Sequence, residues 1–438
     1  MKTGKILVFS LAIILLSGTG LHDAAGQEIN KTYKWTYDVT PGEKIAFENY
    51  DTGVDIRTWD KPEIELHMTI EAEFKNESDA SKLDNYLNNL EFTSSAGRTA
   101  INSKFWKSRN NIFGISTMNI EGMKALRIEK FKMECLLWIP ADAALELTSR
   151  YSEINMEDIG GELILDLYND DLYAGSVGGN SSIDAKYSKM NFREMKNINA
   201  KLYNCELTTA DVGDMIIDSK YSEINCANAG TTGIESYEDE FVFENNGDIK
   251  FIAKYSELTT GKADNLVADT YECEFSADRI KGAKVSSKYS SWEILSADIL
   301  VFESLYEDEL TSDKIRSLKV SDSKYSDFNI ESLENSIIFE DAYENEINIE
   351  KLEASLKRFR VEGKYIDIDL GIASALDCKI NAVIKYPELD IDEDLFRTKI
   401  MIKDGSDLEY EAVKGMEKED MTELVIKGYE IKLSVIEY

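Results

Sequence analysis

Regularly spaced carboxylates are the side chains of this sequence that could do chemistry. A short motif recurs from Arg150 to Asp367, and in most copies an acidic residue is followed directly by an apolar one. One set of these acids forms a candidate outward stripe: Glu206, Glu223, Glu240, Glu257, Glu274 and Glu309. Like charges in a row repel each other, so a divalent cation or a cationic partner would stabilise them. The same row would equally serve as a solvated face that protects a sheet edge.

Several features weigh against a dedicated metal or cofactor site. Lys189 and Ser291 interrupt the acidic row, and the Gly-Gly-x-Gly-x-Asp repeat of calcium-binding solenoids is absent from the sequence. The acidic run at 390–394 resembles the start of a calcium loop, but Leu395 and Met401 stand where Gly and Glu are required. We therefore predict no metal ligands and no cofactor, and at most a weak association of Ca²⁺ with the stripe.

Ingredients for catalysis are scarce. His67 is the only histidine after His22, and the sequence has no phosphate loop, dinucleotide fingerprint or nucleophile elbow. The cysteines are odd in number and form no CxxC pair, which favours small buried residues over disulfides or zinc. We predict no catalytic residues, and a protein that is not an enzyme.

The spacing of the motif predicts the fold that positions these side chains. From Glu206 to Glu274 the acid recurs every 17 residues, and period-2 alternation turns the following apolar residue inward. No proline occurs between Pro140 and Pro387, as an unbroken backbone ladder requires. These features predict an all-β chain: a parallel β-solenoid of about twelve 17-residue turns, each with at least two short strands. Because two motif types alternate, an elongated antiparallel β meander is the alternative.

The alternation of motif types also places tyrosines in columns. One column alternates Lys with Tyr, as in Lys220, Tyr237, Lys254 and Tyr271. The next alternates Tyr with Glu, as in Tyr221, Glu238, Tyr255 and Glu272. This order keeps like charges apart in both columns. If exposed, the rings could stack on glycans or contact a protein, and a stabilising ladder is the simpler interpretation.

The chain divides into four predicted segments. Residues 1–26 have the basic start, apolar run and small residues of a secretory signal peptide. Residues 27–148 form a β-rich α+β capping domain with one helix, which Ser78 caps and in which Leu83, Leu87 and Leu90 share a face. Residues 149–372 form the solenoid, and residues 373–438 a C-terminal antiparallel β cap.

Charge excludes one class of partner. The chain has 49 Lys+Arg against 83 Asp+Glu, a formal net charge of −34, which repels nucleic acid. After the signal peptide, no stretch approaches the ~20 apolar residues of a membrane-spanning helix. We therefore expect an acidic, exported protein of the periplasm or cell surface of a Gram-negative bacterium.

One stretch resembles a known family. In Leu137–Ser182, the segment Ile139-Pro140-Ala141-Asp142 leads into Leu145-Glu146-Leu147-Thr148 and then Tyr151-Ser152-Glu153-Ile154. This stretch is similar to the putative-adhesin β-strand-repeat family of exported bacterial envelope proteins, which usually has Gly-Asp where this chain has Tyr-Ser-Glu or Cys-Glu. The resemblance implies a solenoid-like β fold, a role in adhesion and no catalytic residues.

Together these observations favour a non-enzymatic binding or structural module of the envelope, with an unidentified envelope protein or glycan as partner. The alternative is a carbohydrate-active β-helix enzyme that acts on polysaccharide. That function would require paired carboxylates inside a cleft, which such regular turns do not provide.

Overall fold

The computed structural model describes residues 27–438 apart from 41, 96, 113–114 and 419–420. The predicted signal peptide, residues 1–26, lies outside the described residues. The described residues form two compact units, which divide between Gly213 and Asp214. About 75% of it is strand and 3% helix, and its stacked parallel coils form a β-solenoid of about 13 turns. The predicted fold class is confirmed.

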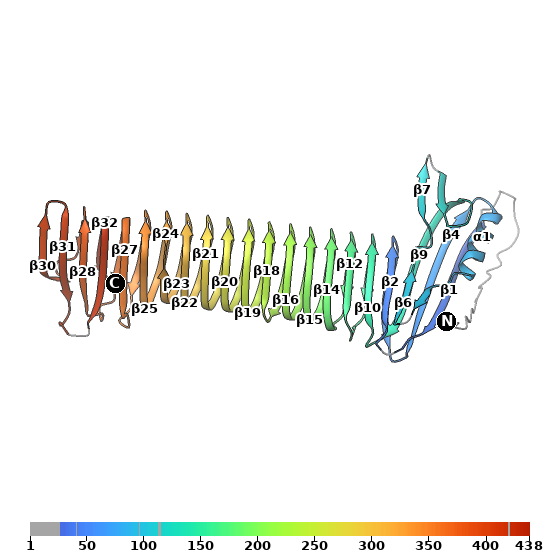
Figure 1. Ribbon diagram of the computed structural model, residues 1–438, viewed down its shortest axis with the longest axis horizontal. Helices are drawn as coiled ribbons and strands as arrows, with labels where there is room; N and C mark the ends of the chain where they lie inside the picture. The colour runs from blue at the N-terminus through green and yellow to red at the C-terminus, as the bar shows by residue number, and fades with distance from the viewer. Residues whose placement is uncertain (1–26, 41, 96, 113–114, 419–420) are drawn as a thin grey trace. The chain divides into compact units, whose positions relative to one another are not determined.

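In the first unit, two sets of parallel strands build the turns (Figure 1). Strands β10 (Ala144–Arg150), β12 (Leu163–Tyr168) and β14 (Val177–Lys186) pair in one set. Strands β11 (Glu153–Met156), β13 (Asp171–Ala174) and β15 (Lys189–Tyr203) pair in the other. The stack also includes β2 (Lys44–Tyr50), parallel to β10, and β3 (Gly53–Trp59), parallel to β11.

This earlier turn falls inside the region assigned to the capping domain. Its corner, Tyr50-Asp51-Thr52-Gly53-Val54, has the same order as the repeat, but a glycine stands at the acidic position. Ile45, Phe47, Val54 and Ile56 are buried in alternation, as in later turns. This copy therefore lacks the acidic residue that marks the later turns.

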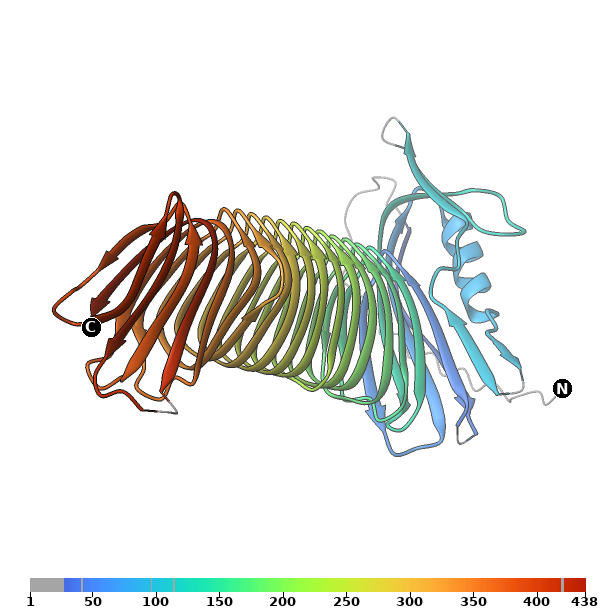
Figure 2. The same ribbon diagram turned by 60° about the vertical axis from the view of Figure 1, so that its left-hand side comes forward.

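The rest of the first unit is an antiparallel sheet with one helix. Strand β4 (Glu63–Phe74) pairs with β1 (Gln27–Asp38) and β9 (Leu126–Pro140). The shorter strands are β5 (Thr93–Ser95), β6 (Arg98–Asn102), β7 (Ser108–Ile112) and β8 (Ile115–Asn119). Helix α1 (Glu77–Asn88) lies against this sheet and buries Leu83 and Leu87 (Figure 2).

The predicted helix needs two corrections. Asn76, not Ser78, is the N-cap, because its side-chain oxygen accepts a hydrogen bond from the Asp79 amide. Leu90 follows the C-cap residue Asn89, so it lies outside the helix. The register of the buried leucines is otherwise as predicted.

In the second unit the turns stack with constant register. Its strands begin with residues 214–220 of β16 (Glu206–Lys220) and continue with β17 (Glu223–Ala229), β18 (Thr232–Tyr237), β19 (Glu240–Lys254), β20 (Glu257–Tyr271), β21 (Glu274–Lys288), β22 (Ser291–Tyr306), β23 (Glu309–Val320), β24 (Ser323–Lys324), β25 (Asp327–Tyr343), β26 (Glu346–Leu352) and β27 (Arg358–Ile372). Leu258 lies opposite Phe241 and Phe275 and is fully buried. The predicted inward apolar column is therefore core, and it includes Trp292.

Many turns form one long strand, whereas the sequence predicted at least two short ones. β20, for example, runs without a break for 15 residues. Its pairing with β21 continues through the corner, where Lys262 lies opposite Arg279 and Ala263 opposite Ile280. The Gly, Asp and Asn corners bend the backbone without ending the hydrogen-bonded ladder.

At the C-terminal end the predicted antiparallel cap is present with one addition. Strand β31 (Asp407–Lys414) pairs antiparallel with β28 (Cys378–Lys385) and β30 (Arg397–Asp404). The last strand, β32 (Thr422–Glu437), instead runs parallel to β27, β28 and β29 (Glu388–Ile391). It carries the motif in the form Tyr429-Glu430-Ile431-Lys432-Leu433, so it completes another turn.

Candidate functional site

Each turn has a left-handed residue at the same place in the motif. In the second unit Tyr221, Glu238, Tyr255 and Glu272 have φ between 50° and 58°. Residues with side chains rarely adopt this conformation, which costs about 1–2 kcal/mol each. The same conformation recurs at Asp51, Tyr151, Asn169, Tyr187, Asn204, Tyr289, Glu307, Tyr325, Glu344, Tyr365, Tyr386 and Glu430. In most copies a strand ends just before this residue and the ladder resumes at the acidic position, whereas β27 and β32 continue through Tyr365 and Glu430.

This corner merges the two predicted tyrosine columns into a single row. Tyr255, at a left-handed position, contacts the rings of Tyr237 and Tyr271, which precede the left-handed residues of neighbouring turns. Ring centroids in the second unit are 5.3–5.8 Å apart with edge-to-face geometry. We call this row the tyrosine ladder: Tyr221, Tyr237, Tyr255, Tyr271, Tyr289, Tyr306, Tyr325, Tyr343, Tyr365, Tyr429 and Tyr386.

The ladder is both a structural element and an accessible surface. Edge-to-face pairs contribute about 0.5–1.5 kcal/mol each beyond the area they bury. The rings at left-handed positions remain accessible, with Tyr255 42% and Tyr289 41% exposed. The first unit has an equivalent row of Tyr50, Tyr151, Tyr168, Tyr187 and Tyr203.

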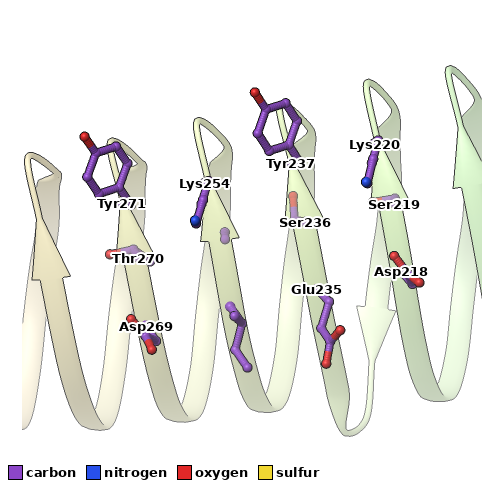
Figure 3. A pocket seen from close by; sticks show the side chains of 12 residues that line it. Asp218, Ser219, Lys220, Glu235, Ser236, Tyr237, Lys254, Asp269, Thr270 and Tyr271 are labelled. Carbon is purple, nitrogen blue, oxygen red and sulfur yellow. The ribbon is translucent and has the colours of Figure 1, made fainter.

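Lysines line one side of the ladder. Figure 3 shows Lys254 between the rings of Tyr237 and Tyr271, with Lys220 one repeat earlier. We call Lys220, Lys254, Lys288, Lys324 and Lys364 the lysine row. Among the residues that the structure describes, none of these five forms an ion pair. In contrast, Lys284 and Lys319, which lie nearby on the same strand face, pair with Glu303 and Glu340.

Glutamates line the other side. Glu238, Glu272 and Glu344 occupy left-handed positions beside Tyr237, Tyr271 and Tyr343. The hydroxyls of these three tyrosines hydrogen-bond to the neighbouring glutamates, and these bonds are the main reason that the tyrosine pKa values are raised. Every two turns of the second unit therefore present two rings, one ammonium group and one carboxylate.

The structure places the predicted acidic stripe on the surface. Glu223, Glu240, Glu257 and Glu274 are exposed and lie directly opposite one another in successive turns. Ser291 interrupts the row and Glu309 continues it. In the first unit Glu206 is half-buried and accepts a hydrogen bond from Lys189 Nζ at 2.6 Å.

The stripe lacks the convergence that a metal site needs. Across residues 27–438, with the gaps given above, no three His, Cys, Asp or Glu side chains are arranged to hold a metal ion. Residues one turn apart in a column are separated by about 4.8 Å of backbone, so their carboxylates form a line rather than a shell. Weak association of Ca²⁺ with the stripe stays a prediction.

A buried polar column lies beside the stripe, and the sequence reasoning did not identify it. From Ser152 to Asn345, the residue before the outward position is Ser in one motif type and Asp, Cys or Asn in the other, whereas Ile366 precedes Asp367. Asp308 Oδ1 accepts hydrogen bonds from the Ser290 amide at 2.9 Å and from Ser287 Oγ at 2.8 Å, and Oδ2 accepts one from the Tyr306 amide at 2.7 Å. The alternation of side chains along a strand would have predicted it, since a residue that directly precedes an outward acid must point inward.

Burial perturbs the aspartates of this column. It raises the pKa of Asp170 and of Asp308 to about 6 and raises that of Asp239, in each case against the opposing effect of hydrogen bonds. Asp239 and Asp308 are separated by Ser256, Cys273 and Ser290, so no buried carboxylate lies next to another. The free cysteines, all buried, occupy this column and the core.

The face that carries the lysine row is open. Beside Tyr237 and Tyr271 lies a shallow groove of ≈ 300 Å³, along which Asp218, Glu235 and Asp269 lie (Figure 3). A second hollow of ≈ 510 Å³ surrounds Gly233, where an added side-chain carbon would meet nothing within 4 Å. Both hollows suit contact with an extended molecule better than enclosure of a small one.

The comparisons with known proteins are sparse. No family model matches the chain, and no curated protein matches it. No helix among the described residues is long and apolar enough to cross a membrane. One solved structure that is similar is described as a putative cell adhesion protein from Clostridium sporogenes ATCC 15579; the match has 7% identity and a TM-score of 0.14, and covers 93% of this chain and all of that one. A match with so low a TM-score supports no conclusion about function.

Proposed function

We propose that this protein is a non-enzymatic binding module of the bacterial envelope that holds its partner along the tyrosine ladder. The observation that carries the proposal is the row of half-exposed, mutually contacting rings, with glutamates on one side and, on the other, lysines that form no ion pair among the described residues. A long periodic surface with open hollows suits attachment to an extended partner. Export to the periplasm or the cell surface is part of the proposal and rests on the sequence of residues 1–26.

Binding to isolated envelopes tests the proposal. The chain from residue 27 on, labelled with a fluorophore, is expected to bind washed envelope preparations saturably. Replacing Tyr255 and Tyr289 with serine should weaken this binding, because it removes two exposed rings of the ladder. Tyr173→Ser is the matched control, since Tyr173 is 46% exposed and is not a member of either tyrosine row.

Two results would contradict the proposal. Equal binding by the ladder variant and the Tyr173 control would show that the ladder is not the contact surface. Release of new reducing ends from a polysaccharide, lost in Glu235→Gln, would instead support the enzyme alternative. Surface labelling of intact cells and cell fractionation would check the location independently.

A further inference from the structure

We infer that the tyrosine ladder of the second unit binds a linear anionic glycan, laid along the direction in which the turns stack. This inference rests on the proposed function and names the class of partner. Three features of the ladder lead to it: its period, the chemistry of its edges and the absence of ion pairs at its lysines.

The period of the ladder excludes regular peptide ligands. Neighbouring turns are about 4.8 Å apart, so the two-turn unit of rings, lysine and glutamate repeats about every 9.6 Å. An extended peptide places side chains on one face about every 6.7 Å, and a helix advances about 5.4 Å per turn. Either would lose register with the ladder within a few turns. A linear glycan with a disaccharide repeat close to two turns in length would stay in register.

The edges of the ladder match the groups that such a glycan presents. The faces of exposed rings such as Tyr255 and Tyr289 can pack against the C–H faces of sugar rings. The carboxylates of Glu238 and Glu272 can accept hydrogen bonds from sugar hydroxyls. A carboxylate on every second sugar would then lie near one lysine of the row.

The lysine row is the reason for choosing an anionic glycan. In a chain of net charge −34, its lysines have many possible acidic partners, yet Lys220, Lys254 and Lys288 form no ion pair with any residue that the structure describes. Their ammonium groups are therefore free to bind a ligand carboxylate without first breaking a contact within the protein. Nucleic acid has a far higher charge density and would be repelled by the rest of the surface.

Each contact is weak, so binding should depend on length. A single exposed ion pair contributes little to the binding free energy. Contacts made simultaneously along several turns increase the overall affinity far beyond that of one contact. Short oligosaccharides are expected to bind poorly, and affinity should rise as the glycan grows to span more two-turn units. This dependence would identify binding along the ladder, as opposed to binding at one of the hollows.

The experiment uses the chain from residue 27 on and measures affinity by biolayer interferometry. The probes are hyaluronan, polygalacturonate and alginate, each as fragments of graded length. Neutral chitin oligosaccharides and poly-L-glutamate serve as ligand controls. The test variant carries Lys220→Gln, Lys254→Gln and Lys288→Gln. The matched control carries Lys262→Gln, Lys357→Gln and Lys403→Gln, which removes the same charge from lysines outside the row that also lack an ion pair among the described residues.

We expect at least one uronate polymer to bind with an affinity that increases with length. The row variant should lose about tenfold in affinity and the control variant less than about twofold. The inference is overturned if no uronate polymer binds, if poly-L-glutamate or the neutral glycan binds equally well, or if both triple variants lose the same affinity. Should envelopes still require Tyr255 and Tyr289 while no uronate binds, the glycan class fails and the proposed function stands.

Discussion

Asp308 allows the cost of one buried charge in the solenoid to be measured. Burial raises the pKa of Asp308 from 3.8 to about 6, although hydrogen bonds from Ser287, Ser290 and Tyr306 favour its charged form. The folded state therefore binds the proton more tightly than the unfolded state. The resulting contribution to stability is fully present below pH 3.8 and is lost as the pH rises through about 6. A pKa difference of about 2 corresponds to roughly 3 kcal/mol of unfolding free energy.

Asp308→Asn removes the charge and keeps the shape. The variant should be more stable than wild type at pH 7 and about equally stable at pH 4. The side-chain nitrogen of the introduced asparagine cannot accept the hydrogen bond from the Tyr306 amide. Losing this bond lowers the expected stabilisation by about 1 kcal/mol. The net stabilisation at pH 7 is therefore about 1–2 kcal/mol. Urea unfolding of both proteins at pH 4, 5, 6 and 7 measures the difference, and hydrogen exchange at the Ser290 and Tyr306 amides shows whether it is local.

The chain supplies its own reciprocal control at Asn345. This residue occupies the same column, and its Oδ1 accepts from the Ser326 amide while its Nδ2 donates to Ser323 Oγ. Asn345→Asp should destabilise the protein more at pH 7 than at pH 4, the opposite of the effect at Asp308. If the stability difference between Asp308→Asn and wild type does not change between pH 4 and pH 7, Asp308 is not a buried carboxylate with a raised pKa, and the reasoning is refuted.

Five further substitutions test the geometry of the turn by thermal and urea unfolding. Leu258→Asp should lower the free energy of unfolding by several kcal/mol because it places an unpaired charge between Phe241 and Phe275. Glu257→Gln, on the outward face, should be tolerated or slightly stabilising at low salt. Equal effects of the two substitutions would invalidate the assignment of the inward and outward faces. Glu272→Asn should stabilise the protein by up to about 1 kcal/mol because Asn adopts left-handed φ more readily than Glu. A lower melting temperature would show that losing the hydrogen bond from Tyr271 costs more than the relaxed backbone gains. Gly363→Ala should disrupt its turn because the new methyl group would collide with the Ala342 carbonyl oxygen. Gly233→Ala is the control, since its methyl group would meet no atom and the substitution should be neutral. A Gly363→Ala variant that is folded and as stable as wild type would contradict the close stacking of the turns.

The spacing of the motif predicted the solenoid because a constant step with no proline admits few other folds. The inward columns followed from parity alone, and residues such as Leu258 and Phe251 are buried accordingly. The copy at Gly53 was missed because glycine replaces the acid, and the copy at Lys432 because lysine does. A third missed copy, Lys385-Tyr386-Pro387-Glu388-Leu389, keeps the acid but has proline in place of serine. All three copies keep the apolar residue after the acidic position, so the apolar column was a better guide to the number of turns than the charge was.

The corner could not be predicted from residue preferences. Tyr and Glu rarely adopt left-handed φ, and the usual glycine signal is absent from these positions. Asn169 and Asn204 occupy the same place in two copies and were the available indication. Without knowledge of the left-handed corner, the two tyrosine columns could not be combined into one ladder. The residues of the candidate site were therefore predicted, but their arrangement was not.

The lysines of the corner can test binding separately from stability, whereas the tyrosines contribute to both. The tyrosines contact their neighbours in adjacent turns, so their presence is explained by stability without any ligand. Within the part of the chain that the structure describes, the lysines of the row form no ion pair. The need to separate like charges explains why they alternate with another residue type, but it does not explain why they are basic. Removing lysines should therefore leave the fold intact while it changes recognition. Loss of binding in the lysine variant with an unchanged melting temperature would show that this surface recognises the partner. Loss of binding in a tyrosine variant alone would not show this, because the tyrosines also stabilise the fold.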